Sequence, residues 1–285
     1  MLRLLVLAAL LPGAAPAEPA PAPPAIRLVQ QDLTEELWEV MRMDAMIDII
    51  ADEAVSEARK LEESGVIVGT GQPWPDVVRR IHDPETLRVT FREGVAEAVA
   101  RLDPGLVRAG LGFYRSPLGQ RFLDLEASAR RAMLTEGVED QGREAFMRDL
   151  TRGGERSAII RRIIRDADLI TPNVESGLNA TVAFSQGFAE GGGYDMPPDQ
   201  SQMLAEAWEQ QPQIEADAAA WLEGFFMIAY SPVTDEEMEG YAGFATSDRG
   251  QALANAMFGG FDKLFAQTSY RMGLAAALRR GGREL

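Results

Sequence analysis

The sequence lacks cysteine altogether and contains a single histidine, His82, among its 285 residues. Without cysteine, disulfides, thiol catalysis and thiolate-bound metal ions are all excluded. Neither the H-E-x-x-H pattern of zinc proteases nor the spacing of a calcium-binding EF-hand is present. We therefore predict no metal site and no cofactor.

Long apolar runs are also scarce. The first, from Leu4 to Leu11, is too short to span a bilayer as a helix, and no later stretch reaches about 18 uninterrupted apolar residues. Arg3 precedes this run, and small residues with A-x-A spacing follow it, which is the layout of a secretory signal peptide. We expect cleavage after Ala17, export to the periplasm and no transmembrane segment in the mature chain. An uncleaved membrane anchor is the alternative.

Basic residues are fewer than acidic ones: the chain has 28 Lys and Arg and 44 Asp and Glu, which gives a formal net charge of −16. This acidic balance argues against nucleic acid and against anionic lipid headgroups as partners. Residues 101–165 nevertheless carry 13 Arg against 9 acidic residues, whereas residues 166–270 carry 17 acidic residues against 2 basic ones. We interpret the two segments as faces that attract each other within one unit. An acidic surface for a cationic partner is the alternative.

The remaining pattern is that of helices. Residues 18–31 form a Pro/Ala-rich spacer that we expect to be extended. A helix is then predicted from Asp32, where Glu35 completes a capping pair, to about Ser64. Further helix starts are indicated wherever a capping residue precedes proline. These pairs are Asp83-Pro84, Asp103-Pro104, Ser116-Pro117 and Thr171-Pro172.

No convincing strand alternation and no Asn-Gly hairpin accompany these helix signals. The sequence therefore predicts an all-α multi-helix bundle of about ten helices. After the signal peptide (1–17) and the spacer (18–31), we expect a first helical half over 32–165. A second half over 166–285 should pack with it as one globular unit.

One short string occurs twice. "GFYRSPLGQ" begins at Gly112, and "GFATSDRGQ" begins at Gly243. In each string a serine can cap a new helix directly after the previous one ends, and a glycine in the first turn allows close helix contact. The preceding helix starts, at Asp103 and Thr234, are separated by the same interval as the two strings. We interpret this constant spacing as an internal duplication of a helical hairpin.

The motif residues of the two corners are candidates for a structural role. They are Phe113, Tyr114, Ser116, Pro117, Gly119 and Gln120 in the first string, and Phe244, Ser247, Gly250 and Gln251 in the second.

The first string resembles the hallmark of domain-of-unknown-function family 2059, a family of exported helical proteins of bacterial envelopes. The similarity is specific around residues 100–135 and looser around 225–270, where Ala245 replaces the second aromatic residue and Asp248 replaces proline. The resemblance implies an exported all-helical protein. It implies no catalytic residue, since the family brings no established activity.

Few side chains are candidates for chemistry. Ser116 would need His82 as a base to act as a nucleophile, but the G-x-S-x-G motif is absent and capping explains Ser116. Asp44, Asp48 and Asp52 recur every four residues, which suits either a hard cation or the solvated edge of an amphipathic helix. We predict no catalytic residue and leave enzymatic activity open, leaning against it.

Two stretches, 221–230 and 257–272, are rich in aromatic residues or Met and suit either a core or a binding groove. A basic amphipathic stretch, 156–165, suits either a membrane surface or a packed helix. We expect a non-enzymatic envelope accessory protein that binds a protein partner or an apolar small molecule. A hydrolase using acidic side chains and a structural, self-associating protein are the alternatives.

Overall fold

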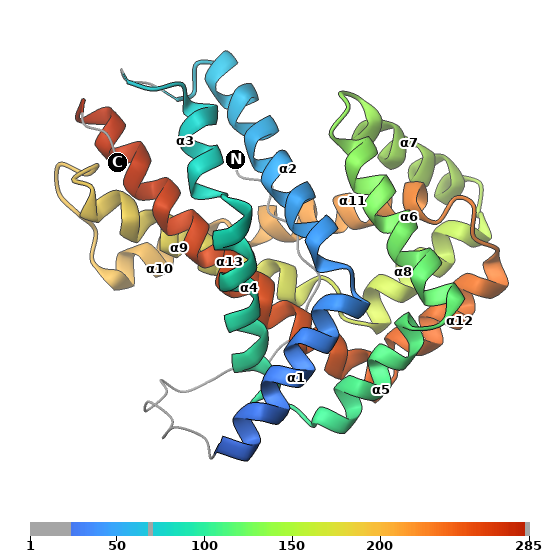
Figure 1. Cartoon of the computed structure of the whole chain (residues 1–285). Coiled ribbons are helices and arrows are strands. Elements are labelled where there is room, and N and C mark those ends of the chain that lie inside the picture. The colour runs from blue at the N-terminus through green and yellow to red at the C-terminus, as the bar shows by residue number, and fades with distance from the viewer. Residues whose placement is uncertain (1–23, 68–70, 283–285) are drawn as a thin grey trace.

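The computed structural model describes residues 24–67 and 71–282, and within these ranges it contains 13 helices and no strand (Figure 1). The predicted all-α fold is therefore confirmed, with more helices than expected. The predicted signal peptide lies outside the described residues. The helices are α1 (Pro24–Val40), α2 (Met43–Glu63), α3 (Trp74–Ile81), α4 (Pro84–Val99), α5 (Pro104–Tyr114), α6 (Pro117–Met133), α7 (Val138–Thr151), α8 (Glu155–Asp166), α9 (Thr171–Glu190), α10 (Gln200–Glu209), α11 (Gln211–Ala229), α12 (Asp235–Ala245) and α13 (Asp248–Arg280).

The first helix differs from the prediction at both ends. It begins at Pro24, inside the predicted spacer, so that Asp32 lies within α1 instead of capping it. It ends at Val40 because Arg42 has φ 53° and ψ 44°, a left-handed conformation that cannot continue a right-handed helix. The single helix predicted up to Ser64 is therefore two helices, α1 and α2.

Most predicted helix starts have the expected caps. The Asp83 carboxylate accepts a hydrogen bond from the Thr86 amide (3.0 Å) and the Asp103 carboxylate accepts one from the Gly105 amide (2.7 Å). Thr234 forms the predicted capping box at the start of α12. The Thr171-Pro172 prediction is wrong, because Thr171 is itself the first residue of α9 and its hydroxyl donates to the Asp168 carboxylate (2.6 Å).

The helices fall into two sets with matching contacts. In the first set α1 packs on α4 and α5, α2 packs on α3 and α4, and α5 packs on α6. In the second set α8 packs on α11 and α12, α9 packs on α10 and α11, and α12 packs on α13. Helix α8, which the predicted division assigns to the first half, packs on α11 and α12 as well as on α7. Arg42 after α1 and Asp168 after α8 are also the two described non-glycine residues with positive φ.

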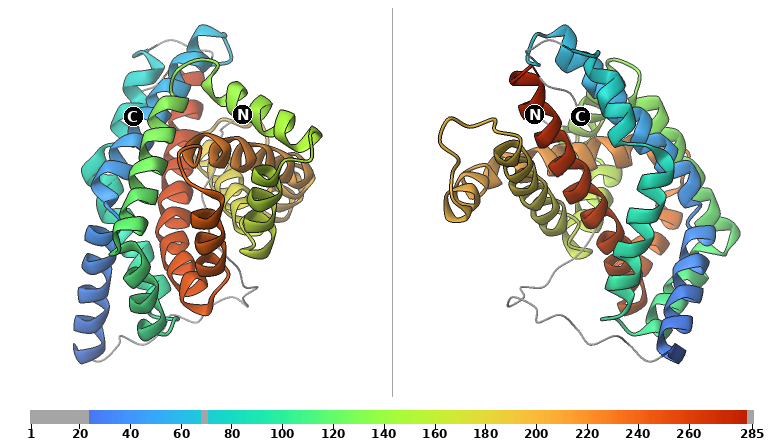
Figure 2. Two further views of the ribbon diagram at one scale, coloured as in Figure 1. Left: turned by 90° about the vertical axis from the view of Figure 1, so that its right-hand side faces the viewer. Right: turned by 60° about the vertical axis from the view of Figure 1, so that its left-hand side comes forward.

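Helix α13 joins the two sets. Its 33 residues pack along α9 of the second set and along α4 and α5 of the first (Figures 1 and 2). The close approach to α4 depends on glycine, because a Cβ on Gly94 would lie 2.9 Å from the Gly260 Cα. By contrast, α10 contacts α9 and α11 and stands out from the rest of the molecule (Figure 2, right).

Ion pairs connect the arginine-rich segment to the acidic one. Arg121 pairs with Glu237 (2.8 Å), and Arg161 pairs with Glu223 (2.8 Å). Arg156 pairs with Asp235 at 2.9 Å. The basic and the acidic segment therefore attract each other within one unit, as predicted. All four arginines of the basic stretch 156–165 pair with carboxylates of the acidic segment, because Arg162 pairs with Glu239 and Arg165 pairs with Asp166 as well.

Candidate functional site

The two repeated strings form two equivalent helix corners. At the α5–α6 corner the Ser116 hydroxyl oxygen accepts a hydrogen bond from the Gly119 amide (3.0 Å) and donates to the Phe113 carbonyl oxygen (2.6 Å). At the α12–α13 corner Ser247 does the same with the Gly250 amide (3.3 Å) and the Phe244 carbonyl oxygen (2.6 Å). Both serines therefore cap helices, as the sequence predicts.

The glutamine of each string ties its corner to a neighbouring helix end. Gln120 Nε2 donates to the Tyr114 carbonyl oxygen (2.6 Å) and to the carbonyl oxygen of Val40 in α1 (3.0 Å). Gln251 Nε2 donates to the Ala245 carbonyl oxygen (3.0 Å) and to that of Ala167 after α8 (3.2 Å). The glutamines thus fix where α1 and α8 end beside their corners.

The corners pack against each other. The rings of Phe113 and Phe244, which occupy the same position in the two strings, stack with centroids 4.1 Å apart and planes 10° apart. Phe122 stacks on Tyr241, with ring centroids 4.7 Å apart. Leu253 and Gly110, which occupy the positions equivalent to Phe122 and Tyr241, also lie against each other. Such reciprocal contacts are the mark of a two-fold-related interface.

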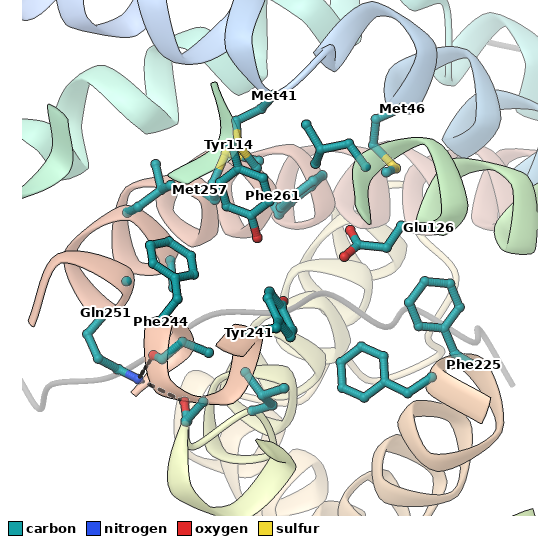
Figure 3. A pocket seen from close by; sticks show the side chains of 18 of the residues that line it. Met41, Met46, Tyr114, Glu126, Phe225, Tyr241, Phe244, Gln251, Met257 and Phe261 are labelled. Atoms are coloured by element: carbon teal, nitrogen blue, oxygen red, sulfur yellow. Dashed lines mark hydrogen bonds between the residues drawn. The ribbon is translucent and has the colours of Figure 1, made fainter. Parts of the chain in front are cut away.

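A cavity of about 150 Å³ lies where the corners meet (Figure 3). Its lining comes from equivalent parts of both sets: the turn after α1 and the turn after α8, and the two corners. Helices α2, α6, α11 and α13 complete it. Methionine and aromatic side chains dominate the lining, among them Met41, Met46, Met257, Trp221, Phe225 and Phe261. Of the motif residues, the cavity is lined by Tyr114, Phe244, Gly250 and Gln251.

The one acidic side chain in the lining is Glu126 of α6, whose carboxyl group points into the cavity (Figure 3). Tyr230, which is fully buried at the end of α11, donates its hydroxyl hydrogen to Glu126 Oε1 at 2.6 Å. Burial raises the pKa of Glu126 to about 7, although the Tyr230 hydrogen bond and the nearby Arg130 charge both lower it. Because it faces the cavity, Glu126 keeps part of its surface accessible.

Three tyrosines surround this carboxyl group. Burial raises the pKa of Tyr114 and of Tyr230 well above the usual range, and the negative charge of Glu126 adds to both shifts. The pKa of Tyr241 is raised by the same two causes. All three phenols are therefore protonated at neutral pH, and Glu126 is the group near the cavity that titrates there.

Arg130 follows Glu126 by one helical turn and also lines the cavity. Its guanidinium group is held by the Glu53 carboxylate of α2 through two hydrogen bonds, Nε to Oε1 (2.9 Å) and Nη2 to Oε2 (2.5 Å). It also lies 5.8 Å from the centre of the Trp221 ring. The positive charge of Arg130 is thus balanced by Glu53, a carboxylate outside the cavity lining.

Sequence reasoning missed Glu126. A signal was present: Glu126 lies four residues after Phe122 and three after Leu123, both buried, which places an acid on the apolar face of α6. The acids that the sequence singled out lie elsewhere. Asp44 and Asp48 both pair with Arg88 (3.0 and 3.2 Å), and no cluster that could hold a metal ion occurs among the described residues.

The Ser116–His82 pair considered from the sequence is not formed in the structure. His82 is buried at the end of α3, with its Nδ1 3.0 Å from the Val78 carbonyl oxygen. Burial lowers the pKa of His82, so the ring is neutral at physiological pH. The Ser116 hydroxyl donates its hydrogen to the Phe113 carbonyl oxygen and accepts from the Gly119 amide. Ser116 is therefore not paired with a base that could activate it as a nucleophile.

Comparison of the chain with models of known protein families, with curated proteins and with solved structures found no match. The resemblance of the first corner to domain-of-unknown-function family 2059 stays a prediction. None of the helices in the described ranges is long and apolar enough to cross a membrane.

Proposed function

We propose that this protein binds a small apolar ligand in the cavity between its two helical corners, as an exported accessory protein of the bacterial envelope. The observation that carries the proposal is the lining, in which methionines and aromatic rings surround one buried carboxyl group. Methionine and aromatic side chains make adaptable apolar binding surfaces, and a few polar groups fix a ligand's orientation.

The size of the cavity limits the ligand. A carrier of larger ligands would enclose several hundred cubic ångströms, whereas this cavity has about 150 Å³. An apolar cavity of about 150 Å³ holds a molecule of the size of benzene. The ligand is therefore a single ring or a short branched chain, not a full lipid.

The two other function classes are less well supported. A hydrolase that uses acidic side chains generally works with a pair of carboxyl groups, whereas this lining contains Glu126 as its one carboxyl group and no serine or histidine. A stable protein–protein interface buries about 800 Å² of surface on each partner, and a little more than half of that surface is apolar. The exposed apolar residues include Leu204 and Trp208, four positions apart on α10, which make up a much smaller area.

Native mass spectrometry of residues 18–285, purified without added ligand, tests the proposal directly. A retained small-molecule mass is expected, and its value begins the chemical identification. Thermal unfolding with added indole and toluene is the companion measurement, because a ligand at about 100 times its Kd adds about 2.7 kcal/mol to the free energy of unfolding.

A matched pair of variants locates the binding. Ala254→Leu fills the cavity with the residue that occupies the equivalent position of the first corner, Leu123, and should abolish both the retained mass and the thermal stabilisation. Ala216→Leu makes the same change at an exposed position of α11 and should leave both unchanged. A bare protein that neither probe stabilises, or equal binding by the Ala254→Leu variant, would contradict the proposal.

A further inference from the structure

The negative charge of ionised Glu126 is not balanced by a positive charge of its own. The groups that face its carboxyl group are Arg130 on α6 itself, Tyr230 after α11, and Tyr114 and Tyr241 from the two corners. The tyrosines are neutral, and Arg130 is already neutralised by Glu53. When Glu126 is ionised, the group formed by Glu126, Arg130 and Glu53 therefore has a net charge of −1.

The carboxyl group also has unused hydrogen-bonding capacity. An ionised carboxylate has about four acceptor positions. Within the described part of the chain, the one side chain that donates to Glu126 is Tyr230, which uses Oε1. Oε2 has no protein donor there, although the group is buried deeply enough to raise its pKa to about 7. A buried charge without full pairing is costly, so a donor from the ligand would stabilise the site.

The walls of the cavity are rich in aromatic rings. Phe225 stacks on Trp221 with centroids 4.7 Å apart, and the Arg130 guanidinium already lies over the Trp221 ring, which shows that these walls accept a cation. The faces of such rings carry negative electrostatic potential and attract ammonium groups. A neutral alcohol would satisfy Oε2 without balancing the charge, and an anion would be repelled by Glu126.

We propose that the ligand is a small apolar amine with one positive charge, whose ammonium group binds the Glu126 carboxylate while its apolar part packs on the methionines and aromatic rings. This inference rests on the proposed function, because it names the chemical class of the ligand of the same cavity. Because the ammonium group pairs with a carboxylate, binding depends on the ionised form of Glu126.

Ionisation of Glu126 sets the pH dependence of binding. An amine stays protonated between pH 6 and pH 8, whereas the ionised fraction of Glu126 in the free protein rises about tenfold over that range, since its pKa is about 7. The affinity for an amine should therefore rise by roughly tenfold from pH 6 to pH 8. A neutral ligand of the same shape should show no such rise.

Three probes of one shape separate the outcomes: benzylamine, benzyl alcohol and benzoate, titrated into the protein by calorimetry at pH 6 and pH 8. Benzylamine should bind most tightly at pH 8, and benzoate should bind most weakly. Glu126→Gln keeps an acceptor for Tyr230 and should lower the affinity for benzylamine about tenfold at pH 8, remove its pH dependence and weaken benzyl alcohol much less. Glu136→Gln, which removes an exposed carboxylate, should change none of these values.

The results distinguish this inference from the proposed function. If benzyl alcohol binds as tightly as benzylamine with no dependence on pH, or if Glu126→Gln binds benzylamine normally, the cavity is a ligand site but its ligand is not a cation. Preference for benzoate would overturn the inference in the same way. If none of the three probes binds, both the amine and the small-ligand cavity are contradicted.

Discussion

The two corners share their framework and differ in what they present to the cavity. The serine cap, the first-turn glycine and the bridging glutamine occur in both, with the same hydrogen bonds. At three equivalent positions that line the cavity in both halves, however, the first half has a polar residue and the second has an apolar one. These equivalent pairs are Glu126 and Met257, Arg130 and Phe261, and Tyr114 and Ala245.

The residues that form the corners and those that line the cavity overlap only in part, because Tyr114, Phe244, Gly250 and Gln251 belong to both and most of the lining lies outside the two strings. The corner is made by backbone requirements, which the same residue types meet in both places. The other lining positions are free to differ, so that Glu126 and Arg130 of the first half have apolar counterparts in the second, although Tyr241 and Gln251 make the second half's lining polar in part. This difference explains how a near-symmetric scaffold encloses an asymmetric cavity.

The corner glycines give the largest expected effect. A Cβ on Gly119 would lie 2.5 Å from the Tyr114 Cα, and one on Gly250 would lie 3.0 Å from the Phe244 carbonyl carbon, with the carbonyl oxygen closer in each case. Backbone atoms cannot move aside cheaply, so Gly119→Leu and Gly250→Leu should each cost about 3 kcal/mol or more. Urea unfolding measures this cost.

Gly112→Ala is the matched control, because nothing lies within 4 Å of the Cβ that it would add. It should be neutral or raise stability by up to about 1 kcal/mol. Normal folding of Gly119→Leu would show that the first corner is not packed as described.

The buried carboxyl group of Glu126 should give the next largest effect on stability. This effect is confined to the first half, because methionine (Met257) occupies the equivalent position of the second half. Because the folded-state pKa of Glu126 is raised to about 7, the folded protein holds this proton more tightly than the unfolded chain. The contribution to stability is therefore full below about pH 4.5 and is lost as the pH rises through 7, by on the order of 2 kcal/mol.

The measurement is the difference in unfolding free energy between Glu126→Gln and the unaltered protein from pH 4 to pH 8. The difference should favour Glu126→Gln increasingly as the pH rises. A difference that stays flat would mean that Glu126 is not desolvated. Met257→Gln places the same side chain at the equivalent position of the second half and should give no pH-dependent difference.

The two serine caps should have equal and smaller effects. Ser116→Ala and Ser247→Ala each remove one hydrogen bond to a first-turn amide and should lower the unfolding free energy by about 1 kcal/mol. Thermal unfolding of both variants checks this value. If Ser116→Ala leaves the melting temperature unchanged but abolishes a cellular phenotype, Ser116 has a function beyond its cap.

A surface ion pair gives the smallest effect and tests the equivalence of the halves most closely. In the first half Glu36 of α1 pairs with Arg108 of α5, at 3.2 Å. In the second half Arg162 of α8 pairs with Glu239 of α12. Glu239 occupies the position equivalent to Arg108 in the repeat. The acidic and basic partners have therefore changed places between the two halves. Reversing the second pair, with Arg162→Glu and Glu239→Arg together, should restore most of the roughly 0.5 kcal/mol lost by either change alone.

A double variant no more stable than the two single variants would show that the geometry of the second pair depends on which partner is the arginine. Stability is measured by urea unfolding at low salt, because screening weakens such exposed pairs.

Much of this architecture is predictable from sequence because it rests on local rules. The helix class, the serine caps at Ser116 and Ser247, and the attraction between the basic and acidic segments all follow from residue types and spacing. The break at Arg42 does not, because arginine is not a residue that normally marks a left-handed turn. Glu126 is harder still: its position on the apolar face of α6 is readable, but the cavity that it faces depends on helices that are distant in the chain, such as α11 before Tyr230.

Helix α13 has a consequence for the order of folding. It follows in the chain every helix that it contacts, and its partners α4 and α5 lie in the first half of the sequence. Until residues 248–280 have been synthesised, the faces of those helices that α13 covers have nothing to pack against. Such long sequence separations slow folding. Because α13 also lines the cavity, the cavity is complete only when this last helix has packed against both sets.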